Sequence, residues 1–459
     1  MPAIRIALPA SLRSLLARGA GSAMVSGFLL VAILTMVGKI VAFAKDAVVA
    51  AKMGTADDLD AFMLVFGFFS FAATVLAGGL PESFMPAYAE LRERRGLRSA
   101  DRLGVQCAAW HFATLLLCGL VITLAAPFLV DWVTHGFSPQ KQELAVSLLR
   151  GLLPFLLCFG LAYLLSAWLR VGKSFLLPAA TPLLVPLGIV IALLLAGHQV
   201  SAWTLVTGTV WGAVAHVLVL LFAVIRRLPR SRGWWRGTVR RWEPAMRTVL
   251  RNALPFLVGG VAFGSAAVVD QTMAAWLPSG SVAVLGYADK LCAVVLAVTA
   301  SPAADVLFPH FVELVAKRDW PGLRKRLFAS AGLIISAALP MTLLLSFMAP
   351  WIVSTLFERG AFDPDDTRRV AEVLRFAAFQ IPFYILGTVA ARVVVSLQAS
   401  RFMLTMSFCA LVLNASLNWL LMRHLGAAGI ALSTVIVHGL CAAATCAACL
   451  VLIRRKEAA

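Results

Sequence analysis

Long uncharged stretches alternate with short charged connections along the whole chain. Because a helix needs roughly 20 apolar residues to cross the hydrocarbon core of a bilayer, a stretch of that length predicts a membrane span. Uncharged stretches of sufficient length occupy residues 105–130, 174–197, 201–225, 402–422 and 424–453. Over the whole chain the pattern predicts twelve spans, which begin near Met24, Ala61, Val105, Val146, Ser174, Ser201, Arg251, Ser281, Leu327, Ala371, Phe402 and Leu425.

The composition agrees with this pattern. Of 459 residues, 61% are hydrophobic and 14% are charged, and the mean hydropathy is +0.89. That is far more apolar surface than one soluble core can bury. We therefore predict an all-α integral membrane protein of about twelve transmembrane helices.

The formal net charge of +18 does not indicate a nucleic-acid partner, because most of the arginines lie in short connections, where positive charge sets the orientation in the membrane. Basic clusters fall on alternate connections, at residues 92–102, 170–173, 226–251, 317–326 and 454–456. The intervening connections, such as 54–60 and 358–369, are poor in basic residues or balance them with acids. We therefore place the basic connections and both termini in the cytoplasm, with the N-terminal segment as an uncleaved lead-in rather than a signal peptide.

An internal repeat indicates two related halves. Val-Ala-Phe at 41–43 and Ala-Val-Val at 47–49 recur 220 positions later, at 261–263 and 267–269. Chance similarity between apolar helices is the alternative explanation. A basic linker at about 226–250 suits a segment on an anionic membrane surface, and it separates a six-helix lobe at 1–228 from a second one at 229–459. Because each lobe has an even number of spans, the pseudo-symmetric copies share one orientation, and such pairs enclose a central cavity.

The sequence contains no constellation for covalent chemistry. The eight cysteines lie almost wholly in apolar runs, and the close pair Cys446 and Cys449 has no histidine or acidic neighbour in sequence. No HExxH, nucleophile elbow or Walker motif appears. We therefore expect a transporter rather than an enzyme, without a cofactor or a metal site.

Ionisable side chains inside predicted spans are few, and their burial costs about 3 kcal/mol each, so they usually face a cavity or a partner. They are Lys39, Lys45, Asp46, Asp270, Asp289, Lys290 and Arg392. Cations predominate in this set, and a cavity lined by them favours an anionic headgroup such as a phosphate or pyrophosphate. Ion pairing of Lys45 with Asp46, and of Asp289 with Lys290, is the structural alternative. Asp60 lies at the end of the second span, where helix capping or hydration competes with a role in binding.

Several segments form an ordered set that resembles a known family. They are GKIVAFAKDAVVA at 38–50, DAF at 60–62, FMP at 84–86, YADK at 287–290 and LFERGAF at 356–362. As a set they resemble the MviN/MurJ family of the multidrug/oligosaccharidyl-lipid/polysaccharide exporter superfamily. The resemblance implies flipping of an undecaprenyl-pyrophosphate-linked saccharide, lipid II, from the cytoplasmic to the periplasmic leaflet of the bacterial inner membrane. It also implies that the partners are this lipid-linked oligosaccharide and the membrane lipids.

Carried over by position, the resemblance implies that Lys39, Lys45 and Lys290 stand where the family has cavity arginines. Asp46, Asp60 and Asp289 match its acids. Lysine keeps the positive charge but loses the bidentate fork that clasps a pyrophosphate. Residues 71–74, which read FAAT, provide no cation where the family has arginines in the second span, and Arg392 is the proposed compensation.

The chain ends after the twelfth predicted span, whereas typical members of the family continue with two more helices associated with a groove for the lipid tail. Another lipid-linked unit, from an exopolysaccharide or O-antigen, is therefore an alternative substrate. An ion-coupled exporter of small molecules is a second alternative. The driving force stays open between membrane potential, a lipid gradient and a cation bound at Asp46, Asp270 or Asp289, and Asp270 is the candidate that we test for ion coupling.

Overall fold

The computed structural model describes residues 23–197, 199–228, 243–397 and 399–458, so most of the predicted basic linker lies outside the described residues. All regular elements of this part are helices. The first half contains α2 (Ala23–Met53), α3 (Asp57–Arg95), α4 (Leu97–Leu124), α5 (Ala126–Val133), α6 (Pro139–Gly151), α7 (Leu153–Val171), α8 (Leu176–Ala180), η1 (Thr181–Leu183), α9 (Leu184–Leu195) and α10 (Ala202–Ile225). The second half contains α11 (Pro244–Ala274), α12 (Ser281–Ala316), α13 (Trp320–Phe347), α14 (Ala349–Phe357), α15 (Pro364–Ala377), α16 (Gln380–Ser396), α17 (Ser400–Leu425) and α18 (Ala427–Glu457).

The helices confirm the prediction of a polytopic membrane protein. Ten described helices are long and apolar enough to cross a bilayer, and α15 with α16, which meet at a 40° bend, would make an eleventh span. The helix α2 is not among them, yet its 31 residues exceed the length that a span requires. These helices correspond in order to the twelve predicted spans. The short helices α5 and α14 had no counterpart in the prediction, whereas the predicted spans that begin near Val146 and Ala371 start within α6 and α15.

The two halves repeat the same series of elements. The helices α4, α5, α6 and α7 have 28, 8, 13 and 19 residues, and α13 to α16 have 28, 9, 14 and 17. The helices α6 and α15 also begin alike, because Ser138 and Asp363 each accept a hydrogen bond from the backbone three residues later, with a proline at the first helical position. The predicted boundary between the lobes near residue 228 stays a prediction.

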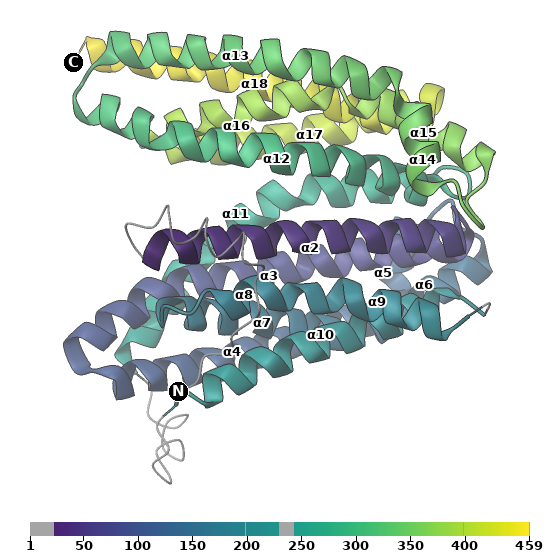
Figure 1. Ribbon diagram of the computed structural model, residues 1–459, viewed down its shortest axis with the longest axis horizontal. Coiled ribbons are helices and arrows are strands. Elements are labelled where there is room, and N and C mark those ends of the chain that lie inside the picture. The colour runs from purple at the N-terminus through teal and green to yellow at the C-terminus, as the bar shows by residue number, and fades with distance from the viewer. Residues whose placement is uncertain (1–22, 198, 229–242, 398, 459) are drawn as a thin grey trace, which may run out of the picture.

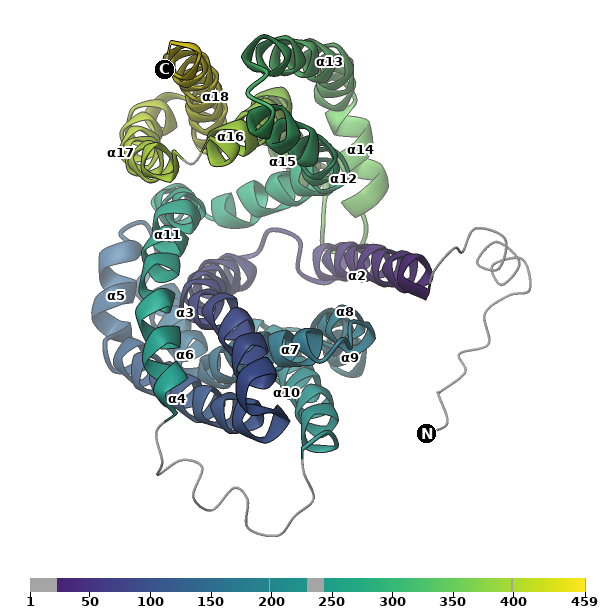
Figure 2. The same cartoon turned by 90° about the vertical axis from the view of Figure 1, so that its left-hand side faces the viewer.

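Figure 1 shows the helices of each half running roughly side by side, with α11 between the two groups. The end-on view in Figure 2 places α12 to α18 on one side and α3 to α10 on the other, with α2 and α11 between them. Glycine allows α11 to lie close against α3, since a Cβ at Gly79 would come 2.9 Å from the carbonyl oxygen of Ala253. The helix α11 therefore contacts the first half along its length, although it belongs to the second half in sequence.

The basic connections gather at one end of the bundle. The turn between α3 and α4, the turn between α12 and α13, and the end of α18 all lie at the left-hand end of Figure 1. The last turns of α3 and α18 carry Arg92, Arg94, Arg95, Arg454, Arg455 and Lys456. The opposite end contains the turn between α2 and α3 and the short helices α6, α14 and α15.

Candidate functional site

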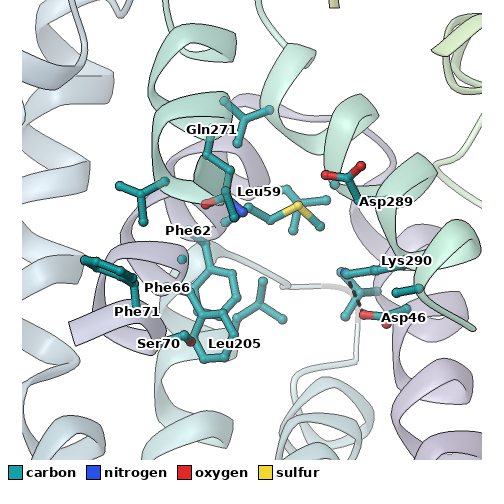
Figure 3. A pocket seen from close by; sticks show the side chains of 18 of the residues that line it. Asp46, Leu59, Phe62, Phe66, Ser70, Phe71, Leu205, Gln271, Asp289 and Lys290 are labelled. Atoms are coloured by element: carbon teal, nitrogen blue, oxygen red, sulfur yellow. Dashed lines mark hydrogen bonds and ion pairs between the residues drawn. The ribbon is translucent and has the colours of Figure 1, made fainter. Parts of the chain in front are cut away.

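A cavity of about 480 Å³ lies between the two halves. Its walls come from α2, α3, α9 and α10 on one side and from α11 and α12 on the other. Apolar residues such as Phe62 and Phe66 line much of it, and Ser70, Gln271 and Asp289 add polar groups (Figure 3). The cavity is thus amphipathic, with its charged groups concentrated where α2 faces α12.

Two lysines converge on one carboxylate at that wall. Asp46 accepts hydrogen bonds on the same oxygen, Oδ1, from Lys45 Nζ at 2.6 Å and from Lys290 Nζ at 2.7 Å. Lys45 and Asp46 belong to α2, whereas Lys290 comes from α12 in the other half (Figure 3). Asp46 is only 7% exposed. Burial of an unpaired carboxylate is costly, and the two lysines compensate its charge. The cluster carries one net positive charge and faces the cavity.

This arrangement contains one of the two ion pairs considered as alternatives to substrate binding. Lys45 does pair with Asp46, but Lys290 pairs with Asp46 across the halves and not with its neighbour Asp289. Adjacent residues on a helix point about 100° apart, and here the two side chains diverge. Asp289 lines the cavity with an exposed side chain, and no ion pair to it is found among the described residues.

Two of the predicted cations lie apart from this cluster. Lys39 is exposed, is not part of the cavity lining, and is separated from Asp46 by seven residues of α2, or about 10 Å along the helix. Arg392 on α16 is half-buried, with its guanidinium 5.5 Å from the ring centroid of Phe308 on α12. The structure therefore brings Lys45, Asp46, Asp289 and Lys290 together and leaves Lys39 and Arg392 outside the cavity wall.

Asp60 joins the two halves at the end of the molecule opposite the basic connections. Its carboxylate accepts hydrogen bonds from the backbone N–H groups of Gly280 and Ala283, each at 2.7 Å, at the start of α12. It also accepts one from Lys141 Nζ of α6 at 3.0 Å, and it is 1% exposed. A carboxylate that holds a helix N-terminus is favourably placed in the field of that helix. Asp60 therefore caps a helix, which was the alternative to a role in binding, and it is not part of the cavity lining.

Further contacts close the same end, which we call the outer seal. Its backbone contacts include a hydrogen bond from Ala361 N to the carbonyl oxygen of Ala51 at 2.9 Å. The Tyr287 hydroxyl donates to the carbonyl oxygen of Gly54 at 3.3 Å. Gly280 has a φ of +85°, and a Cβ there would lie 2.9 Å from the carbonyl oxygen of Thr55. Close backbone approach thus brings the halves together at the outer seal.

Asp270 lies outside the cavity, in a polar cluster within the second half. Its carboxylate accepts hydrogen bonds from Asn418 Nδ2 at 2.6 Å and from Thr434 Oγ1 at 3.3 Å. These partners bring together α11, α17 and α18. The buried side-chain oxygen of Asn418 has no hydrogen-bond partner among the described residues. Oxygen ligands of this kind are those that hard cations prefer.

The residues that complete these sites carry only weak signals in the sequence. Lys141 is 7% exposed and binds both Asp57 and Asp60, although it lies in a polar segment that reads as a loop. Asn418 and Gln271 are uncharged, so a search for ionisable residues passes over them. Their polarity within apolar stretches was the available signal. No group of three or more histidine, cysteine or acidic residues suited to a metal gathers in the described part of the chain.

The paired halves, their membrane-spanning helices and the amphipathic cavity between them define a polytopic membrane transporter. Solved structures share this fold. A structure described as "Lipid II flippase MurJ, inward closed conformation" superposes with a TM-score of 0.76 at 19% identity, over 91% of this chain and 86% of that chain. An inward-facing multidrug resistance transporter of the MATE family reaches the same TM-score at 16% identity, over 91% of this chain and 95% of that chain.

The sequence comparisons identify the family. The model of the family described as "Lipid II flippase MurJ" matches residues 49–457. A "Probable lipid II flippase MurJ" of Rhizobium tropici is 26% identical over 426 residues, which are 90% of this chain and 78% of that protein. A "Lipid II flippase MurJ" of Burkholderia cenocepacia is 25% identical over 427 residues, 89% and 79% of the two chains. The chain belongs to the MurJ family of lipid II flippases, which are transporters and not enzymes.

Proposed function

We propose that this protein flips lipid II, or a closely similar undecaprenyl-pyrophosphate-linked saccharide, from the cytoplasmic to the periplasmic leaflet by alternating access. The observation that carries the proposal is the cluster of Lys45, Asp46 and Lys290, because two cations from opposite halves meet at the cavity wall. A pyrophosphate that competes with Asp46 for these lysines would release the bond between the halves. Substrate binding and the movement of the halves are thereby coupled.

The remaining predicted residues act around this cluster in the proposal. Asp289 faces the cavity and responds to the charge of the bound headgroup. Lys39 meets the headgroup as it enters from the basic end, and Arg392 adds positive charge on the second half. Asp60 contributes by closing the outer seal rather than by direct contact.

The placement of charge supports the membrane orientation on which the proposed direction of transport depends. Positively charged connections stay in the cytoplasm, so the basic end of the bundle and both chain termini are cytoplasmic, and the outer seal faces the periplasm of a bacterium with the protein in its inner membrane. The closed outer seal supports an inward-facing state. In agreement, the inward-facing MATE structure matches with a TM-score of 0.76 and an outward-facing one with 0.61.

We also propose that a cation bound beside Asp270 contributes to the driving force. Asp270, Thr434 and Asn418 would offer three oxygen ligands from three helices of the second half once the Asn418 amide, which now donates its N–H to Asp270, turns its unpartnered oxygen toward the carboxylate. Such a cation would neutralise a carboxylate buried within the bilayer. Its binding would therefore favour one arrangement of α11 relative to α17 and α18.

A reconstituted flipping assay tests the main proposal. Proteoliposomes with fluorescent lipid II in one leaflet report its arrival in the other leaflet by accessibility to a quencher. We expect Lys45→Gln with Lys290→Gln to abolish flipping, whereas Lys317→Gln, which removes a surface cation paired with Glu313, should leave it intact. Flipping of lipid II by the doubly substituted protein at the rate of the wild type would refute the proposed site.

The same assay separates the alternatives. Transport of an undecaprenyl-pyrophosphate-linked exopolysaccharide or O-antigen unit, but not of lipid II, would assign the protein to another glycan. Transport of neither lipid, together with ion-dependent export of a small cation, would make it a small-molecule exporter. Lipid II is the expected substrate because the family model spans residues 49–457, which include most of the cavity lining, although Lys45 and Asp46 precede this range.

A further inference from the structure

A second cavity of about 250 Å³ adjoins the central one toward the basic end. Its lining comes from α3, α7 and α11, and includes Glu82, Tyr163 and Arg170. Thr74 lines both cavities, so the two spaces meet at this residue. The second cavity is therefore part of the same pathway rather than an isolated pocket.

One face of α3 connects the two cavities. Ser70, Thr74, Gly78 and Glu82 follow one another at intervals of four residues, and each lines one or both of the spaces. Residues four apart are neighbours on a helix surface, each about 40° further round, so this row slants across α3 while it rises about 18 Å. The pathway thus has a polar stripe that begins with hydroxyl groups in the central cavity and ends at a carboxylate.

Glu82 and Arg170 are opposite charges that line one space without pairing. Both side chains are exposed, and no ion pair to either one is found among the described residues. This differs from Asp46, whose carboxylate is occupied by two lysines. A carboxylate binds an ammonium group through charge-assisted hydrogen bonds, and a guanidinium forms bidentate bonds to a carboxylate. Together the two side chains match a zwitterionic ligand.

We propose that Glu82 and Arg170 form a subsite for the part of the transported headgroup that carries an amine and a carboxylate, as a peptide on a lipid-linked saccharide does. The inference rests on the proposed function, since the pyrophosphate occupies the cluster of Lys45 and Lys290 and the peptide extends along α3 toward the cytoplasm. Glu82 binds the side-chain ammonium group, and Arg170 binds a peptide carboxylate. The subsite distinguishes a peptide-bearing lipid from a lipid-linked glycan without peptide.

Binding of three defined lipids to the purified full-length protein tests this inference. The probes are lipid II with a free side-chain amine on its peptide, the same lipid with that amine acetylated, and an undecaprenyl-pyrophosphate-linked disaccharide without peptide. Titrations by native mass spectrometry give a Kd for each. We expect wild-type protein to prefer the free-amine lipid over the acetylated one by about tenfold, the effect of one hydrogen bond to a charged group.

The substitutions locate that preference. Glu82→Gln should remove the preference for the free amine and leave the Kd of the peptide-free lipid unchanged. Arg170→Gln should weaken both peptide-bearing lipids about equally. Glu90→Gln on the same helix, which removes an exposed carboxylate paired with Arg94, is the matched control and should change none of the three values.

The possible failures are distinguishable. If Glu82→Gln and Arg170→Gln leave all three affinities as in wild type while Lys45→Gln weakens them, the subsite is wrong and the proposed function stands. If wild-type protein retains none of the three lipids, the proposed function fails and the subsite fails with it. Equal binding of the free-amine and acetylated lipids by wild-type protein also overturns the role of Glu82.

Discussion

The carboxylate of Asp60 caps α12 at Gly280, so that a side chain of the first half stabilises a helix start in the second half. Gly280 adopts a left-handed conformation, with a φ of +85°, that directs its N–H toward this carboxylate and that a β-carbon would obstruct. The bond joins the halves only while the outer seal is closed. An opening of the seal must break this bond and the one from Ala283, whereas the bond from Lys141 lies within the first half and can persist.

Replacing Asp60 with alanine should open the outer seal more often. The change removes the two hydrogen bonds by which one buried carboxylate joins the halves, and losing bonds to a charged group costs roughly 2 kcal/mol or more. A cysteine at Gln271 in the cavity, in a background without the eight native cysteines, should then react at least about tenfold faster with an impermeant maleimide added from the periplasmic side.

Asp365→Ala is the control for this experiment, because Asp365 is an exposed acid at the same end and pairs only with Arg368 in the described structure. It should leave the labelling rate as it is in the parent protein. Equal labelling of the Asp60→Ala and Asp365→Ala proteins would contradict the role of Asp60 in the seal.

A disulfide across the outer seal should stop transport. The backbone N–H of Ala361 donates to the carbonyl oxygen of Ala51 at 2.9 Å, which brings the two backbones within the range that a disulfide can bridge. Ala51→Cys with Ala361→Cys should form a disulfide under oxidation and lower flipping to background, and reduction should restore it. Each single substitution provides a control, and undiminished flipping by the fully cross-linked protein would rule out alternating access.

The sequence was sufficient to predict the spans, because a run of 20 or more apolar residues has few stable alternatives to a membrane helix. It was also sufficient for the cavity cations Lys45 and Lys290, since a charge inside such a run is costly and noticeable. It did not reveal that Lys290 would pair with Asp46 rather than with its neighbour in sequence, Asp289. Ion pairs between the two halves depend on how the lobes pack against each other. The hydrophobic periodicity of a single sequence does not specify that packing.

The same limit explains Asp60 and Asp270. The position of Asp60 at a helix start allowed capping or binding, and only the approach of α12 decides between them. Asp270 lies in sequence beside Gln271, yet Gln271 lines the cavity while Asp270 faces α17 and α18. A single step along a helix changes direction by about 100°, and the packing of the neighbouring helices determines what each direction meets.

Removing both lysines around Asp46 should destabilise the protein, whereas a further change of Asp46 should restore its stability. Lys45→Gln with Lys290→Gln leaves a carboxylate that is 7% exposed without a counter-ion, at a cost of about 3 kcal/mol. Addition of Asp46→Asn removes the unpaired charge. The melting temperature in detergent should therefore fall for the double variant and recover for the triple variant, while neither one binds lipid II.

This pattern separates stability from binding. A triple variant that regains both its melting temperature and its affinity for lipid II would show that the lysines serve the fold alone. Lys290→Arg is the complementary variant, because it keeps the charge and adds a bidentate fork. It should bind lipid II at least as tightly as the wild type does.

Asp270→Asn should remove the dependence of the protein on a cation. Asparagine keeps the size and one oxygen acceptor but lacks the negative charge that a cation beside Asn418 and Thr434 would balance. In the wild-type protein, replacing choline chloride with sodium chloride at constant ionic strength should raise the melting temperature and stimulate flipping. Neither effect should occur in the Asp270→Asn protein, and Asp365→Asn should respond as the wild type does. If Asp270→Asn keeps the full response to sodium, the coupling ion does not bind at this carboxylate, and Asp289 in the cavity becomes the next residue to substitute.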